Sequence, residues 1–146
     1  MPKGYWLLII TANSLFLLVD RLLKHLALYQ WRDARLWHNF LGWDPSLNPG
    51  VAFSLPAPNQ AVVILTIPIL LILGRLLFTA IKNNQKINQW ALCLIIAGAS
   101  SNLIDRLLYQ HTVDYLRLFT LVINIADVMI TGGFAIYLLK NFQKKT

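Results

Sequence analysis

Residues 118–139 read LFTLVINIADVMITGGFAIYLL and hold one charged side chain, Asp127. A run of about 20 apolar residues is long enough to cross the hydrocarbon core of a bilayer as a helix. A carboxylate at the bilayer centre costs about 2.5–3.5 kcal/mol on insertion scales. Asp127 is therefore expected to lie near an interface, to be satisfied by polar partners, or to have a function.

The composition of the whole chain is that of a membrane protein. Of its 146 residues, 57% are hydrophobic and 13% are charged, whereas soluble domains carry about 25% charged residues. The net charge of +7 fits basic residues that bind anionic headgroups and set topology, so membrane lipids are expected partners. No basic stripe with interleaved aromatic residues is present, so nucleic acid is not an expected partner.

Three further apolar stretches precede this segment. We expect one integral membrane domain over residues 1–146, with helical spans at about 4–28, 60–81, 87–104 and 120–139, because a helix satisfies its own backbone polar groups inside a bilayer. The fold class predicted is an all-α membrane protein with four transmembrane helices.

Two of the connections are expected on the same side of the membrane, since two spans separate them. The outer loop 29–59 contains three tryptophans, which prefer the headgroup level. The connection 105–123 alternates in polarity, which is compatible with short strands. Together they predict a small extracytoplasmic β-cradle with an interfacial amphipathic helix. Seven basic residues without aspartates lie on the other side, which favours a cytoplasmic N-terminus and C-terminus.

Asp114 lies thirteen residues before Asp127. Two carboxylates that converge cannot both ionise, so one holds a proton while the other can activate a water. This is the chemistry of aspartyl proteases, and it needs no metal or other cofactor. A structural alternative stays open, because Asn124 and Asp127 have the spacing of a helix capping box and Asp114 could be an ordinary loop acid.

Other polar motifs accompany the two aspartates. In GASSNLIDRL (98–107) the small residues permit close helix contact, and Asn102, Asp105 and Arg106 can share a helix face, with an Asp105–Arg106 ion-pair network supporting a site. Alone, this motif is equally explained as a helix end. The spacing of Asp20 and Lys24 allows an i,i+4 pair.

The motif NPGVAFS (48–54) offers Asn48 as a cap or backbone ligand and Gly50 for a tight turn. Taken alone, this motif is better explained as a plain loop turn.

Other functions have less support. The chain has no HExxH and no GxSxG motif, and its histidines lack metal-ligand spacing. A dyad of Ser54 and Lys24 stays open on composition, although no spacing favours it. Two further alternatives are a small transporter or proton-relay protein that uses intramembrane aspartates, and a structural subunit that uses Asp–Arg pairs for assembly.

Taken together and in order, these motifs resemble the lipoprotein signal peptidase (signal peptidase II) family, aspartyl peptidases of the bacterial cytoplasmic (inner) membrane. The resemblance spans nearly the whole chain. It is carried by five segments: Asp20-Arg-Leu-Leu-Lys24, Asn48-Pro-Gly-Val-Ala-Phe-Ser54, Gly98 through Asn102-Leu-Ile-Asp105-Arg106, Val113-Asp114-Tyr115 and Asn124-Ile-Ala-Asp127.

The resemblance implies a substrate and a site. The substrate would be a prolipoprotein whose cysteine carries diacylglycerol, cleaved just before that cysteine by a monomeric enzyme near the outer leaflet. The catalytic residues would be Asp114 and Asp127. The substrate-binding or supporting residues would be Asn48, Gly50, Asn102, Asp105, Arg106, Asn124, Asp20 and Lys24.

The chain departs from the family pattern at three positions. Ser101 stands where glycine is common, and Tyr115 and Ile123 stand where phenylalanine is usual. The segment between the two aspartates is also short, which predicts a trimmed outer loop and an altered substrate or inhibitor preference.

Overall fold

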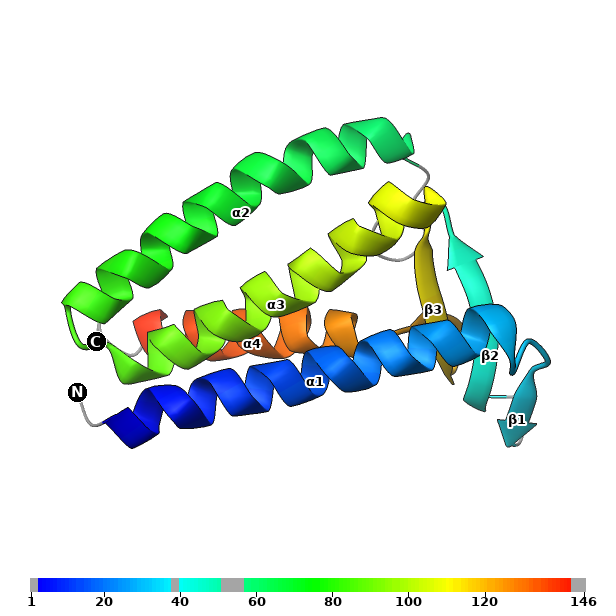
Figure 1. Ribbon diagram of the computed structural model, residues 1–146, viewed down its shortest axis with the longest axis horizontal. Coiled ribbons are helices and arrows are strands. Elements are labelled where there is room, and N and C mark those ends of the chain that lie inside the picture. The colour runs from blue at the N-terminus through cyan, green and yellow to red at the C-terminus, as the bar shows by residue number, and fades with distance from the viewer. Residues whose placement is uncertain (1–2, 38–39, 51–56, 143–146) are drawn as a thin grey trace.

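The computed structural model describes residues 3–37, 40–50 and 57–142. Within these residues the chain forms four helices and one four-stranded antiparallel sheet (Figure 1). The helices are α1 (Lys3–Tyr29), α2 (Asn59–Lys82), α3 (Lys86–Tyr109) and α4 (Ile125–Phe142). The strands are β1 (Arg35–Trp37), β2 (Leu41–Asn48), β3 (Thr112–Leu118) and β4 (Leu121–Ile123). The predicted class of four membrane-spanning helices with a small outer sheet is confirmed.

All four helices are long and apolar enough to cross a membrane. Their large apolar side chains remain exposed, as Leu71 at 71% and Phe78 at 68% illustrate, because lipid rather than protein covers such a surface. Two boundaries differ from the expected spans. Helix α3 continues to Tyr109 rather than ending near 104, and α4 begins at Ile125 because residues 121–123 form a strand.

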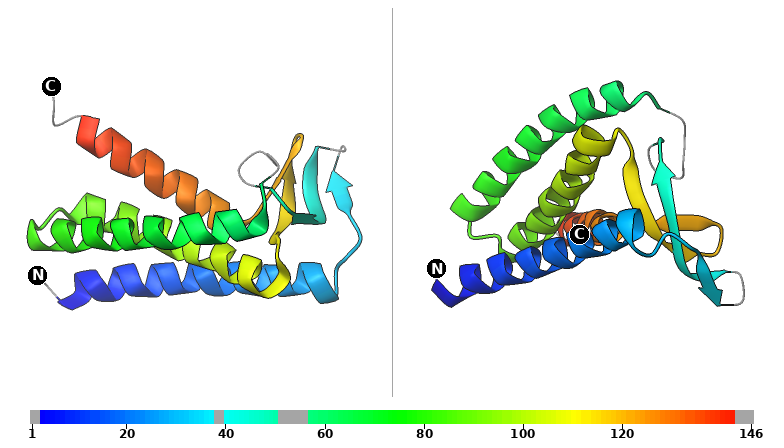
Figure 2. Two further views of the ribbon diagram at one scale, coloured as in Figure 1. Left: turned by 90° about the horizontal axis from the view of Figure 1, so that it is seen from above. Right: turned by 45° about the vertical axis from the view of Figure 1, so that its right-hand side comes forward.

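The sheet lies at one end of the helix bundle, and α1 begins and α4 ends at the other end (Figures 1 and 2). Its strands run in the order β1-β2-β3-β4, so the outer loop and the third connection meet through β2 and β3. The described part of the outer loop forms β1 and β2 and contains no helix. The expected interfacial helix therefore has no counterpart there, and residues 38–39 and 51–56 lie outside the described residues.

The register between β2 and β3 brings the NPG motif to the third connection. Asn48 is paired with Thr112 and Ser46 with Asp114, after an irregularity between Trp43 and Ser46. Pro45 lies in this irregularity, as expected for a residue that cannot donate a backbone hydrogen bond to the ladder. The end of β2 is thereby placed beside the strand that carries Asp114.

Helix α3 is central and contacts each of the other three helices. Its contact with α4 depends on glycine, because a Cβ on Gly98 would lie 2.5 Å from the main-chain oxygen of Ala126, and one on Gly133 would lie 2.7 Å from that of Ala91. Small residues allow such close approach of helices in membranes. This contact brings the first turn of α4 against the polar residues of α3.

Candidate active site

Asp114 and Asp127 come from different elements and line the same cavity of about 350 Å³. Asp114 lies on β3 and is 1% exposed, whereas Asp127 lies in the first turn of α4 and is half-buried. Asn48, Asn102 and Arg106 line the cavity as well. The structure therefore brings together the two aspartates that the sequence singles out.

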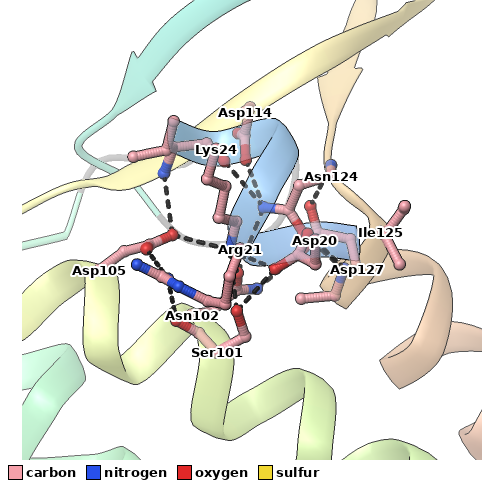
Figure 3. A network of polar contacts seen from close by, with 12 residues as sticks. Asp20, Arg21, Lys24, Ser101, Asn102, Asp105, Asp114, Asn124, Ile125 and Asp127 are labelled. Carbon is pink, nitrogen blue, oxygen red and sulfur yellow. Dashed lines mark hydrogen bonds and ion pairs between the residues drawn. The ribbon is translucent and has the colours of Figure 1, made fainter. Parts of the chain in front are cut away.

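Asn124 connects the two aspartates (Figure 3). Its side-chain Nδ2 donates to Asp114 Oδ1 at 2.7 Å, and its Oδ1 accepts from the backbone N–H of Asp127 at 2.8 Å. No hydrogen bond joins the two carboxylates directly within the part of the chain that the structure describes. Their relative position is set by this shared carboxamide.

Asp127 also takes part in the helix capping box. Its Oδ2 accepts from the backbone N–H of Asn124 at 3.2 Å, which makes the capping reciprocal. Its other oxygen, Oδ1, accepts from Asn102 Nδ2 at 2.8 Å. The capping interpretation is thus geometrically correct, and it leaves the same carboxylate facing the cavity.

Asp114 is surrounded by neutral hydrogen-bond donors. Asn48 Nδ2 donates to its Oδ2 at 3.0 Å, and Asn124 donates to its Oδ1. Burial raises the pKa of Asp114 to about 6, the negative charge of Asp127 adds to this effect, and the two carboxamide hydrogen bonds oppose it. Asp114 can therefore exchange a proton at mildly acidic to neutral pH.

A second polar network lies directly beneath the cavity, with Lys24 at its centre. The Lys24 ammonium contacts Asp20 at 3.0 Å and Asp105 at 2.7 Å, and all three side chains are buried. It also donates to Asn102 Oδ1 at 2.8 Å. Because Asn102 in turn holds Asp127, the buried ion pairs are connected to the cavity through one carboxamide.

Asp105 and Arg106 do not form the expected ion-pair network. Asp105 binds Arg21 and Lys24 and accepts from the backbone N–H of Val113. Arg106 instead donates to the main-chain oxygen of Gly50. The expectation was wrong because adjacent residues on a helix project about 100° apart and face different neighbours.

Several polar residues of the site were not predicted. Arg21 pairs with Asp105, and Ser101, which the sequence presents as a packing residue, donates to Asp20 at 2.6 Å. Tyr115 donates to Asp20 Oδ1 at 3.0 Å and accepts from the backbone N–H of Ile125 at 3.0 Å. The signal for these roles is that all three residues are polar and lie inside the quoted motifs.

Gly50 lies in a turn, as the sequence predicts. Its backbone N–H donates to Asn48 Oδ1 at 2.9 Å, which leaves Asn48 Nδ2 oriented toward Asp114. Ser54, named in the alternative dyad with Lys24, lies outside the described residues.

The fold and this site define a multi-pass membrane enzyme with two aspartates on one cavity. The sequence profile of the family described as signal peptidase (SPase) II matches residues 12–143. The chain therefore belongs to the signal peptidase II family. It is a protease of a bacterial membrane, and the transporter alternative is not favoured.

Individual relatives agree with this assignment. The chain is 34% identical to the lipoprotein signal peptidase of Chlamydia pneumoniae over 146 residues, covering 87% of this chain and 84% of the relative. It is 32% identical to the lipoprotein signal peptidase of Aquifex aeolicus over 154 residues, and this match covers 99% of this chain and 91% of the relative.

Two solved structures, each described as a bacterial membrane enzyme, have the same fold. The first, at 2.3 Å resolution, has a TM-score of 0.82 and 25% sequence identity, and the match covers 100% of this chain and 92% of the solved chain. The second, at 1.9 Å resolution, has a TM-score of 0.75 and 26% sequence identity, and the match covers 96% of this chain and 94% of the solved chain.

Proposed function

We propose that the protein is an aspartic endopeptidase that removes the signal peptide from diacylglyceryl-modified prolipoproteins, cleaving just before the lipidated cysteine. Asp114 and Asp127 are its catalytic residues. The observation that carries this proposal is that both carboxylates line one cavity and share Asn124 as a hydrogen-bond partner. Membership of the signal peptidase II family supports the class of reaction.

In the proposed mechanism the two aspartates share one proton and titrate as a unit. The ionised carboxylate takes a proton from a water while the water oxygen attacks the scissile carbonyl carbon. The protonated carboxyl group donates its proton to the carbonyl oxygen, which gives a neutral tetrahedral diol. The diol collapses when the C–N bond breaks: the carboxyl group that took the proton from water gives it to the leaving nitrogen, and a diol hydroxyl returns a proton to the other carboxylate. The pair is restored with one shared proton, and no covalent enzyme intermediate is needed.

The walls of the cavity suit an extended peptide attached to a lipid. Asn48, Gly50 and Arg106 supply polar groups on the side of the sheet, whereas Val62 of α2 and Ile130 of α4 supply apolar walls within the membrane-spanning helices. The diacylglyceryl chains of the substrate cannot leave the bilayer at low cost. The substrate is therefore expected to enter sideways from the lipid phase.

The proposed orientation places the active site near the outer leaflet and both ends of the chain in the cytoplasm. Support comes from the distribution of charge: the aspartates gather at the sheet end of the bundle, whereas Lys82, Lys86 and Lys140 lie at the opposite end. Unpaired basic residues favour the cytoplasmic side. Nothing in the proposed mechanism requires a second copy of the chain, and we propose a monomer.

The test is cleavage of a diacylglyceryl-modified precursor by the purified protein in detergent, with release of the signal peptide followed by mass spectrometry. Asp114→Asn and Asp127→Asn should each abolish cleavage, whereas Asp33→Asn, in an exposed part of the outer loop, should not. Activity should also survive a chelator. Near-normal turnover of Asp127→Asn would assign that residue to helix capping alone.

An additional substitution separates capping from catalysis. The Asn side chain keeps one oxygen that can accept the Asn124 N–H, but its amide nitrogen then faces the Asn102 Nδ2 donor. Asp127→Asn should therefore lower the free energy of unfolding by about 1 kcal/mol through the loss of that hydrogen bond. Asp127→Ala loses the cap and should cost about 1 kcal/mol more. Both variants should be inactive, because neither carries the ionisable carboxyl group.

A further inference from the structure

Among the described residues, the end of the bundle opposite the sheet carries lysines and no aspartate. All six aspartates of the chain lie within the described residues, and they belong to the sheet, the outer loop or the helix ends next to them. Lys82, Lys86 and Lys140 lie at the other end, and none of them forms an ion pair within the residues that the structure describes. Within the described part of the chain, the positive charge of these three lysines has no carboxylate partner.

A cavity of about 380 Å³ lies at this basic end. Lys86 at the start of α3 and Lys140 near the end of α4 both line it, and the turn between α2 and α3 supplies carboxamide side chains. Asn88 and Asn141 contact each other at 3.5 Å and hold the two helix ends together. The cavity is thus lined by lysines from two helices, and their positive charge suits a phosphate group.

The neighbourhood of this cavity indicates a lipid rather than a soluble anion. Tyr5 donates to the main-chain oxygen of Lys86 at 2.7 Å, and the Lys86 ammonium lies 5.6 Å from the centre of the Tyr5 ring. Tyrosine is enriched at the membrane–water interface, which places the ammonium at headgroup level. On α4, Leu139 and Phe142 lie within two residues of Lys140 in the sequence and are 64% and 67% exposed, so acyl chains have an apolar surface to cover.

We propose that this cavity binds the headgroup of an anionic phospholipid, with the phosphate between Lys86 and Lys140 and the acyl chains against the lipid-facing side of α4. The site lies at the opposite end of the bundle from Asp114 and Asp127 (Figure 1). It is independent of the proposed peptidase mechanism, and its failure would leave that mechanism untouched.

The experiment measures binding of phosphatidylglycerol and phosphatidylcholine with identical acyl chains to the purified full-length protein in detergent. Bound lipid is quantified by native mass spectrometry, and stabilisation is followed by the thermal shift of tryptophan fluorescence, since a ligand of the folded state raises the unfolding temperature. The variants are Lys86→Gln, Lys140→Gln and the double variant. Lys82→Gln is the matched control, because Lys82 is an exposed lysine at the same end that does not line the cavity.

We expect phosphatidylglycerol to bind the wild-type protein more tightly than phosphatidylcholine. Each single variant should weaken phosphatidylglycerol binding about fivefold and the double variant about 30-fold, whereas Lys82→Gln should stay within about twofold. Lys86→Arg, which keeps the charge, should retain binding. If the double variant does not fold, the single variants and the arginine variant decide the question.

Three results would overturn the proposal. Equal binding of the two lipids would show that the headgroup charge is not recognised. A loss in Lys82→Gln as large as that in the cavity variants would indicate general attraction to a basic surface. Equal stabilisation by inorganic phosphate at the same concentration would assign the cavity to a soluble anion instead of a lipid.

Discussion

Removal of the Tyr115 hydroxyl group is the most direct test of the contacts that hold the site in place. Tyr115 follows Asp114 on β3, is 2% exposed, and stacks on Trp43 with ring centres 5.3 Å apart. Its hydroxyl donates to Asp20 and accepts from the backbone N–H of Ile125, the first residue of α4. Burial raises its pKa, so the hydroxyl remains a donor at all physiological pH values. One oxygen thus connects the strand that carries Asp114 to the helix that carries Asp127.

Tyr115→Phe removes this oxygen and keeps the ring. The hydrogen bond to the Asp20 carboxylate is charge-assisted, and such bonds contribute about 1.5–3 kcal/mol. The lower figure applies here because Asp20 keeps Lys24, Ser101 and the N–H of Ala126 as partners. The Ile125 N–H loses its partner, which costs about 1 kcal/mol or slightly more. The free energy of unfolding should therefore fall by about 2.5 kcal/mol.

Two measurements check this prediction. Reversible unfolding in mixed micelles should give the loss of stability, with Tyr137→Phe as the control, because the Tyr137 hydroxyl makes no side-chain hydrogen bond within the described part of the chain. On the folded protein, kcat should fall about tenfold with little change in KM, since the substrate-binding surface remains while the two aspartates shift relative to each other. An unfolding free energy within 0.5 kcal/mol of the wild type, with normal kcat, would refute the reasoning.

Three further outcomes follow from the same contacts. Lys24→Met should cost about 3–5 kcal/mol, measured by the same unfolding assay, because it leaves two buried carboxylates without their shared cation. Gly98→Ala should cost about 1–3 kcal/mol and reduce turnover, because its Cβ would meet main-chain atoms of α4, whereas Gly132→Ala, with open space around it, should be neutral in both assays. Asp114, followed by infrared spectroscopy of its carboxyl group, should titrate at about pH 6, and at a lower pH in Asp127→Asn, where the neighbouring charge is absent. Its folded pKa lies above the unfolded value of 3.8, so this group makes stability fall as pH rises from about 4 to 6 and contributes no further change above that.

The sequence predicts the parts of this molecule that depend on local pattern. The lengths of the apolar stretches predict the four spans, and the capping spacing of Asn124 and Asp127 indicates where α4 begins. In that motif both interpretations of Asp127 are compatible, because one carboxylate oxygen caps the helix, the other accepts from Asn102, and the residue still lines the cavity.

The partners of the charged residues could not be predicted from local spacing. Asp105 pairs with Arg21, 84 positions away, rather than with its neighbour Arg106. Which side chains meet depends on the rotation and depth of one helix against another, and in this bundle that is set by close contact at glycines such as Gly98. A short-range pattern contains no information about that contact.

The arrangement of the basic side chains explains how Asp114, a proposed catalytic residue, can stay protonated although cations lie nearby. An ammonium or guanidinium group bonded directly to Asp114 would stabilise its ionised form and lower its pKa. Both members of the proposed pair would then be ionised, and neither could donate a proton to the scissile carbonyl. In the structure Arg21 and Lys24 are bonded to two supporting aspartates, and Arg106 donates to a main-chain oxygen. Among the described side chains, Asp114 receives hydrogen bonds from neutral carboxamides alone. The buried ion pairs thus serve the proposed chemistry because they hold Arg21 and Lys24 on other carboxylates and leave Asp114 without a directly bonded cation.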